Sequence, residues 1–289
     1  MSWNPYTLVV DGSYFLHRTY HAIPYLSNRA GQPTNAIYGT VNAIHKLLDN
    51  YAPQHMAVVF DSPEPCFRHK LSPLYKAHRP EYDIAMTSQV PYIHAIIRAL
   101  GIPLVVRPGF EGDDIIGTVA TIAANEGHSA LICTGDKDMM QLVCPNIGIE
   151  DPFKNMRIGR EQVYQKFNVY PEHIADLLAL IGDSADGIRG VPGVGSKTAA
   201  GLIGQYASLD NAIANLGDMK GRVAYLIQEG LENLKLDRVL TKIVTDLDLG
   251  VDMESLKIQP TNIPELTKIY QELEFMQYNF APRVNHEYP

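Results

Sequence analysis

The sequence predicts an α/β domain followed by a mainly helical one. In the first half, short β-branched runs alternate with amphipathic helical patterns, which is typical of a largely parallel sheet. From about Glu161 the strand signal fades, and helical patterns continue to about residue 273. We expect an α/β domain at residues 1–170 and a helical domain at 171–280. Residues 281–289 contain two prolines and little pattern, which indicates a tail or the start of a linker.

The expected elements of the first half follow from hydrophobic spacing. Strands are predicted at residues 7–10, 56–60, 104–106, 130–133 and, more weakly, 147–149. A helix at 35–50 places Ile37, Val41, Ile44 and Leu48 on one face, and a helix at 88–100 does the same with Val90, Ile93, Ile97 and Leu100.

Composition excludes some classes of protein. The 289 residues are 46% hydrophobic and 19% charged, without a run of eighteen apolar residues or a signal peptide. We therefore expect a cytoplasmic protein, without a membrane partner. Cys66, Cys133 and Cys144 are odd in number and lack metal-type spacing, so reduced thiols without a chemical role are expected.

The acidic side chains follow the predicted strands. The first strand ends at Asp11 and the second at Asp61, and the third and fourth lead into further acids: Glu111, Asp113, Asp114, Asp136 and Asp138. Because the carboxyl ends of strands line the ligand crevice of an open α/β sheet, these acids are expected to converge. The alternative is that each Asp caps a helix or a turn, but caps do not require an acid at successive strand ends.

Converging carboxylates predict divalent metals. Like charges raise one another's pKa values, and hard cations with a preference for oxygen ligands relieve that repulsion. Two magnesium ions, which manganese could replace, would clamp a phosphodiester and activate a water molecule. Metals bound there would also offset part of the net charge of −8, which is otherwise unusual for a protein that binds DNA.

Other stretches indicate contacts with phosphate. Residues 188–200 form a glycine-rich turn that leads into a helix capped by Ser196, as in helix-hairpin-helix modules. A nucleotide P-loop is the weaker alternative, because Ser196 stands before Lys197 and Thr198 and a helix precedes the loop. Residues 67–82 mix basic and aromatic side chains, which suits a frayed single strand, although a solvated loop is the other interpretation. Asp183 and Asp186 lie in the turn before the hairpin and are further candidate ligands.

Seven motifs together resemble one family. They read V-D-G-S at 10–13, V-F-D at 59–61, Y-K-A-H-R-P at 75–80, E-G-D-D at 111–114, T-G-D-K-D at 134–138, G-D-S-A-D at 182–186 and G-V-P-G-V-G-S-K-T at 190–198. In this order, from about Thr7 to Asp246, they resemble the bacterial 5'-3' exonuclease and flap-endonuclease family, most closely the N-terminal nuclease domain of bacterial DNA polymerase I.

The resemblance implies a PIN-like nuclease domain with a helical arch at about 62–90, and a helix-three-turn-helix motif at 183–205. One metal would be held by Asp11, Asp61, Glu111 and Asp113, the second by Asp136, Asp138 and Asp183, with Asp114 between the two and Asp186 in the outer shell. Lys76, Arg79 and Arg18 would act on the scissile phosphate, and Tyr75 would stack on a terminal base. DNA would also contact Arg68, Lys70, Gly193, Gly195, Ser196, Lys197 and Thr198, with potassium as a further cation at the hairpin.

The expected function is hydrolysis of DNA at 5' flaps and 5' ends, for removal of primers and repair flaps. Expected partners are DNA with 5' flaps, 5' overhangs or nicks, RNA primer–DNA hybrids, and polymerase domains if the chain is part of a polymerase; we expect a monomer associated with the bacterial nucleoid. A junction-binding scaffold and a PIN-type ribonuclease remain alternatives. Gly112 replaces a frequent Ala and Gly187 the usual Asn, and the latter change is expected to loosen the turn that holds Asp183 and Asp186.

Overall fold

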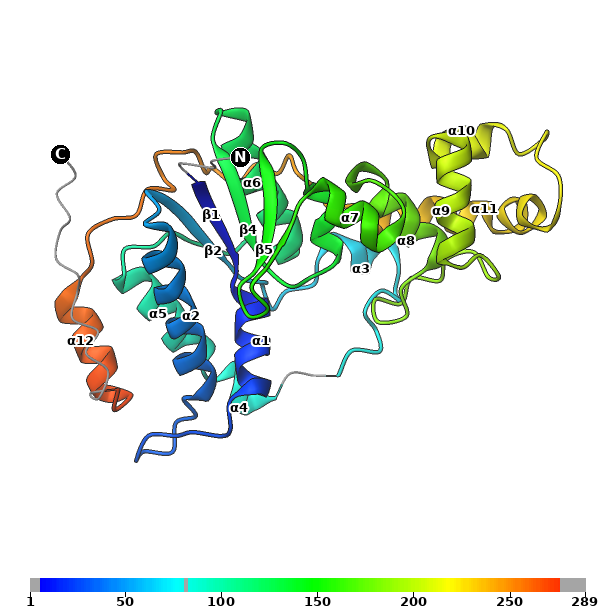
Figure 1. The fold of residues 1–289 in the computed structure, drawn as a ribbon. Coiled ribbons are helices and arrows are strands. Elements are labelled where there is room, and N and C mark those ends of the chain that lie inside the picture. The colour runs from blue at the N-terminus through cyan, green and yellow to red at the C-terminus, as the bar shows by residue number, and fades with distance from the viewer. Residues whose placement is uncertain (1–5, 81–82, 276–289) are drawn as a thin grey trace.

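The computed structural model describes residues 6–80 and 83–275, and the predicted tail at 281–289 lies outside them. A six-stranded sheet has the order β3-β2-β1-β4-β5-β6 (Figure 1). The strands are β1 (Tyr6–Asp11), β2 (His55–Val59), β3 (Leu104–Val105), β4 (Ser129–Cys133), β5 (Ile147–Asp151) and β6 (Met156–Ile158). All five expected strands are confirmed and pair in parallel, whereas the short antiparallel β6 was not predicted.

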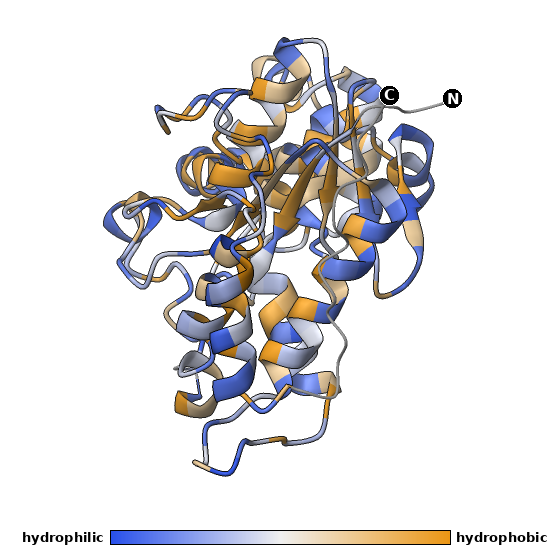
Figure 2. Cartoon of the chain, turned by 90° about the vertical axis from the view of Figure 1, so that its left-hand side faces the viewer, coloured by the Kyte–Doolittle hydropathy of each residue, from blue (hydrophilic) through white to orange (hydrophobic). Residues whose placement is uncertain are grey.

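Helices cover both faces of the sheet. In β1, Leu8 and Val10 pack with one group of helices and Val9 with the other, which is the two-residue period of a strand buried on both sides. The first group is α1 (Gly12–Ala22), α2 (Asn35–Tyr51), α5 (Val90–Ala99) and α12 (Ile263–Glu272), and α6 (Gly112–Asn125) covers the other face. In Figure 2 the strands are mostly hydrophobic and lie enclosed between these helices.

The second half is mainly helical and extends to one side of the sheet (Figure 1). It contains α7 (Arg160–Phe167), α8 (Ile174–Ile181), α9 (Ser196–Tyr206), α10 (Leu209–Ala214) and α11 (Arg222–Thr241), with 3-10 helices at Asp138–Leu142 and Pro171–His173. Residues 242–262 contain no helix, and α12 packs against α5 rather than in the helical domain. The prediction of a helical domain that includes α12 is therefore wrong, because the apolar face of α12 is buried on the first domain.

Two short helices lie in the region predicted as an arch: α3 (Phe67–Leu71) and α4 (Ile84–Thr87). Residues 72–79 between them form turns, and residues 81 and 82 are outside the described range. In the part of the chain that the structure describes, no helix is long and apolar enough to cross a membrane.

Arg68 on α3 joins three segments of the chain. Its Nε donates to the carbonyl of Leu240 at 2.9 Å, and one Nη donates to the carbonyl of Lys242 at 2.7 Å, so it binds the end of α11. Both Nη atoms also donate to the carboxylate of Asp114, at 2.6 and 2.8 Å, and one donates to Glu111 at 2.9 Å. Arg68 is 2% exposed and Asp114 is 0% exposed, so this ion pair is inside the protein. It fixes α3 and α11 to the start of α6.

Replacing Arg68 by Leu should lower the free energy of unfolding by about 3–5 kcal/mol, because the Asp114 carboxylate then stays buried without its partner. The double variant Arg68→Leu/Asp114→Leu should lose clearly less than the sum of the two single variants. Urea unfolding of the four proteins measures this coupling. Additive losses, within about 0.5 kcal/mol, would contradict the pairing.

His94 on α5 gives the fold a dependence on pH. Its Nε2 is buried without a hydrogen-bond partner among the described residues, and its ring packs edge-on against Phe60 at 4.5 Å. Burial, together with the charge of Arg98, lowers the pKa of His94 from 6.5 to about 4. The unfolded chain therefore takes up the proton first.

The stability that neutral His94 contributes should be complete above about pH 6.5 and be lost as the pH falls towards 4. The variant His94→Leu has no imidazole to protonate at this position. Its free energy of unfolding should therefore fall less between pH 7.5 and pH 5 than that of the wild type. Urea midpoints measured across that range test this prediction. Parallel pH profiles for the two proteins would show that His94 has the same pKa folded and unfolded.

Candidate functional site

Asp11 lies where β1 passes into α1 and serves as the N-cap of that helix. One carboxylate oxygen accepts from the amide of Tyr14 at 2.8 Å and the other from the hydroxyl of Thr134 at 2.8 Å. Asp11 is 7% exposed. Burial raises its pKa to about 7 in spite of these bonds, and Asp61 and Asp136 raise it further. The capping alternative therefore holds for this residue, but it does not remove the cost of the buried charge.

Asp61, after β2, rests on the start of α6. Its carboxylate accepts from the amide of Gly112 at 2.7 Å. A Cβ on Gly112 would lie 3.2 Å from the same carboxylate oxygen, so glycine leaves more room here than the expected Ala would. Glycine at position 112, in place of the more frequent alanine, therefore allows Asp61 to lie close to the first turn of α6.

Asp113 is at the centre of the acids. It is on the first turn of α6, and burial and the neighbouring Asp136 raise its pKa well above its usual value. Asp61 and Asp11 raise it as well, whereas Lys76 lowers it. The carboxylates that follow β1, β2, β3 and β4 therefore interact with one another, as the order of the strands predicts.

Asp136 lies in the loop after β4, and Asp138 begins the 3-10 helix that follows this loop. Asp136 accepts from the amide of Asp138 at 2.8 Å. Burial and Asp136 together raise the pKa of Asp138 to about 7. Its Oδ1 atom is buried and has no hydrogen-bond partner in the described part of the chain. A buried carboxylate oxygen of this kind is suited to bind a cation.

The remaining acids form ion pairs with basic side chains of the protein. Glu111 pairs with Lys76 and Arg68, Asp186 with Arg79 at 2.6 Å, and Asp183 with Lys137 at 2.6 Å. Within residues 6–80 and 83–275, no three His, Cys, Asp or Glu side chains stand at the spacing of a ready metal site. The donor set nevertheless fits hard divalent cations, because Asp11 is buried, Asp113 and Asp138 are half-buried, and neighbouring carboxylates raise the pKa of each of the three.

Asp114 does not lie between the other acids as expected. Its oxygens accept from Arg68, from the amide of Val244 at 2.9 Å and from the amide of Glu111 at 3.3 Å. The prediction that Asp114 bridges two metals is wrong for this structure, because its carboxylate is fully used inside the protein.

Two predicted DNA contacts are buried as well. Arg68 is 2% exposed and Tyr75 is 3% exposed. The hydroxyl of Tyr75 donates to Glu111 at 2.8 Å, and burial raises its pKa. Neither side chain can meet DNA in this arrangement, so both predictions are corrected. Lys70 is exposed and stays a candidate contact.

Lys76 and Arg79 lie beside the acids, on the turns after α3. Lys76 is half-buried; burial lowers its pKa, but Glu111 and Asp186 raise it by more. Its amide donates to the carbonyl of Asp186 at 2.9 Å. Gly187 has φ of +69°, and a Cβ there would lie 2.1 Å from the carbonyl of Leu74. Glycine therefore lets the two turns touch, which is the opposite of the expected loosening.

The glycine hairpin is open to solvent. Gly193 has φ of +90°, and Gly193, Gly195, Ser196, Lys197 and Thr198 are all exposed. The N-cap of α9 is Gly195 and Ser196 is the first helical residue, so the prediction that Ser196 is the cap is wrong. The helix α8 precedes the loop, which argues against a P-loop. The exposed amides at the start of α9 are free to approach a phosphate.

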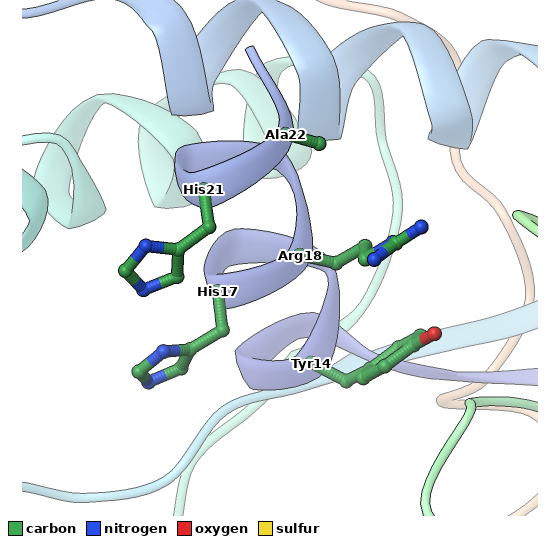
Figure 3. Close-up of a pocket in the computed structure, with 5 residues that line it drawn as sticks. All are labelled: Tyr14, His17, Arg18, His21 and Ala22. Atoms are coloured by element: carbon green, nitrogen blue, oxygen red, sulfur yellow. The ribbon is translucent and has the colours of Figure 1, made fainter. Parts of the chain in front are cut away.

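Arg18 lies on α1 at an open cavity of about 320 Å³ (Figure 3). Arg18 and Tyr14 point to one side of the helix, and His17 and His21 to the other. The two imidazole rings are stacked with centroids 6.3 Å apart. Arg18 is exposed and forms no ion pair among the described residues.

Asp237 on α11 binds the backbone of the glycine hairpin, and the sequence analysis did not predict this role. It is 4% exposed and accepts from the amide of Gly190 at 2.9 Å. The signal was available, since Asp237 stands between the buried Leu234 and Leu240 on the same face of a helical pattern. A carboxylate on a core face requires a partner, and here the partner is the hairpin backbone.

Family models and known proteins match most of this chain. The model described as "5'-3' exonuclease, N-terminal resolvase-like domain" matches residues 6–168, and "5'-3' exonuclease, C-terminal SAM fold" matches residues 169–264. A protein named 5'-3' exonuclease from Aquifex aeolicus is 38% identical over 266 residues, covering 92% of this chain and 91% of that protein. DNA polymerase I from Pseudomonas aeruginosa is 41% identical over 96% of this chain, which spans 31% of the polymerase.

Solved structures show the same fold. The bacteriophage T5 D15 flap endonuclease, in a complex with DNA and metal ions, matches with a TM-score of 0.70 at 21% identity, over 93% of this chain and 100% of that one. The catalytic core of Rad2 matches with a TM-score of 0.61 at 15% identity, over 93% and 87% of the two chains. With both family models matched along most of its length, this chain belongs to the 5'-3' exonuclease family.

Proposed function

We propose that this chain is a structure-specific 5' nuclease, which cuts DNA at 5' flaps and releases nucleotides from 5' ends. The observation that carries the proposal is the group of mutually repelling carboxylates around Asp113, at the ends of successive strands. This group needs no protein nucleophile, since oxygen donors alone suit phosphodiester hydrolysis by water that is assisted by magnesium or manganese.

Each group of residues has a part in this reaction. Asp11, Asp61, Asp113, Asp136 and Asp138 would hold two divalent cations, with Glu111, Asp183 and Asp186 as further ligands. When bound, the cations supply the Lewis acidity that lowers the pKa of a water and stabilises charge on the reacting phosphate. Asp114 keeps a structural part, because Arg68 binds it and thereby fixes the first turn of α6.

Lys76 and Arg79 would exchange their carboxylate partners for a phosphate group of the substrate. In this structure they neutralise Glu111 and Asp186, and cations on those acids would release both side chains. The released ammonium and guanidinium groups are then placed to contact the scissile phosphate, since they extend from the turns after α3 towards the acids. The exposed hairpin at residues 193–198 would bind duplex DNA, with a potassium ion as an additional phosphate contact.

The proposed biological use is the removal of RNA primers and repair flaps from nucleoid DNA in the cytoplasm. Substrates would be 5' flaps, 5' overhangs and nicks. The polymerase relatives carry a corresponding region within a longer chain, so a covalent connection to polymerase domains is part of the proposal.

A junction-binding scaffold is the second candidate. One observation favours it: four acids, namely Glu111, Asp114, Asp183 and Asp186, are paired with basic side chains of the protein. A scaffold would keep those pairs when DNA binds, whereas an enzyme must exchange at least some of them for metal ions.

Cleavage of a 5'-flap duplex with magnesium or with EDTA separates the two functions. Wild-type protein should cut near the flap base with magnesium only, and Asp113→Asn should reduce the rate by about 100-fold or more, since it removes the central donor. The matched control is Asp248→Asn, an exposed aspartate on the irregular segment 242–262, which should cut like wild type.

Tight binding of flap DNA without magnesium-dependent cutting would establish the scaffold instead. Linear single-stranded RNA should be cut slowly or not at all under the same conditions. Preferential cutting of that RNA would identify a PIN-type ribonuclease.

A further inference from the structure

Asp151, the last residue of β5, is a buried acid that has no part in the proposed reaction. It is 0% exposed, and the hydroxyl of Tyr14 donates to its carboxylate, 3.3 Å from both oxygens. Its other partners come from its own loop: the amide of Phe153 at 3.1 Å and the ammonium of Lys154 at 2.8 Å. A buried carboxylate requires such partners, whereas an apolar side chain of similar size does not. What the acid adds at this position is therefore the bond to Tyr14.

Tyr14, on the first turn of α1, contacts two acids. Its amide donates to Asp11 at 2.8 Å, and its hydroxyl donates to Asp151, although β1 and β5 are separated in the sheet by β4. In Figure 3 its side chain extends to the same side of α1 as that of Arg18. The ring also packs edge-on against Phe153, with centroids 5.8 Å apart. Tyr14 thus connects the end of β1 to the end of β5.

The chain that follows β4 packs directly on this hydrogen bond. A Cβ on Gly135 would lie 2.2 Å from the hydroxyl oxygen of Tyr14 and 2.9 Å from an oxygen of Asp151. The backbone of Gly135 is therefore in contact with both partners, and no side chain fits between them. Because Gly135 directly precedes Asp136, the bond between the tyrosine and the aspartate limits where Asp136 can lie.

The same loop is also bound to the end of β1. The hydroxyl of Thr134 donates to Asp11 at 2.8 Å and accepts from the amide of Asp136 at 3.1 Å. The carboxylate of Asp136 in turn accepts from the amide of Asp138 at 2.8 Å. Hydrogen bonds therefore link three of the proposed metal ligands, and the bond between the hydroxyl and the buried carboxylate closes this network on the side of β5.

We propose that Asp151 is a positioning residue for metal binding. It holds the hydroxyl of Tyr14 against the backbone of Gly135, and this contact fixes the spacing between Asp11 and the acids that follow β4. Asp151 acts through Tyr14 and is not itself a ligand. The inference rests on the proposed function, because it concerns the residues proposed to hold the cations. Replacing residues that orient metal ligands commonly lowers metal affinity by about 10- to 100-fold.

Manganese binding to the protein without DNA tests this role, because electron paramagnetic resonance measures the free ion directly. Tyr14→Phe removes only the hydroxyl, Asp151→Leu removes the acceptor, and Asp151→Asn keeps an acceptor oxygen on a side chain of the same size. The matched control is Tyr92→Phe. Tyr92 likewise donates its hydroxyl to a carboxylate, that of Glu272 at 2.6 Å, but this bond joins α5 to α12. Thermal unfolding confirms that each variant is folded.

Tyr14→Phe and Asp151→Leu should each weaken manganese binding by about 10-fold, and should raise the magnesium concentration for half-maximal flap cleavage by about the same factor. At saturating magnesium kcat should stay within about twofold of the wild type, because no ligand and no substrate contact is lost. The double variant should bind manganese as well as the weaker single variant, since both changes break one hydrogen bond. Asp151→Asn should restore most of the affinity.

Variants that bind manganese as tightly as Tyr92→Phe would overturn the positioning role, even if the wild type cuts flaps normally. Losses that multiply in the double variant would overturn it too, because the two residues would then act separately. A wild-type protein that binds manganese but does not cut flap DNA would overturn the proposed nuclease instead. In that case the manganese comparison still decides the role of Asp151, because it does not depend on cleavage.

Discussion

The buried pair of Arg68 and Asp114 is the interaction on which the rest of the structure depends. Arg68 brings together α3, the start of α6 and the end of α11, which are more than 40 and more than 120 residues apart in sequence. Because a guanidinium and a carboxylate without water must satisfy all their hydrogen bonds, the pair allows little freedom in how these segments meet. The acids of the first domain and the helical domain are thereby held in one arrangement.

The site is then a balance between carboxylates and cations. Strand order brings Asp11, Asp61, Asp113 and Asp136 together, which raises the pKa of the most buried members. Lys76, Arg79 and Lys137 offset charge at the edge of the group, but the centre around Asp113 keeps its repulsion. Divalent metals would act on that centre, and phosphate would compete for the basic groups at the edge. Metal binding and DNA binding are therefore expected to support each other.

Much of this could be predicted from the sequence, since strand periodicity and acids at strand ends are local signals. The strands and the helices at 35–51 and 90–99 are confirmed. Asp11, Asp61 and Asp136 each raise the pKa of Asp113, as expected of neighbouring acids, and their joint role as metal ligands stays a prediction. The roles of Arg68 and Tyr75 could not be predicted in this way. A basic or aromatic residue in a short loop has the same local pattern whether it faces DNA or is buried against Asp114 and Glu111, and only the tertiary fold decides between the two. The packing of α12 on α5 could not be predicted either, because it depends on an apolar face that is far away in the sequence.

The central claim is that Asp113 holds metal while Asp114 is bound by Arg68. Crystals soaked in manganese would test it directly, because the anomalous signal locates each ion and the map shows each carboxylate. We predict an ion about 2.2 Å from an oxygen of Asp113, with both oxygens of Asp114 still on the Arg68 guanidinium. An Asp114 carboxylate turned onto the ion, with Arg68 released, would contradict the account.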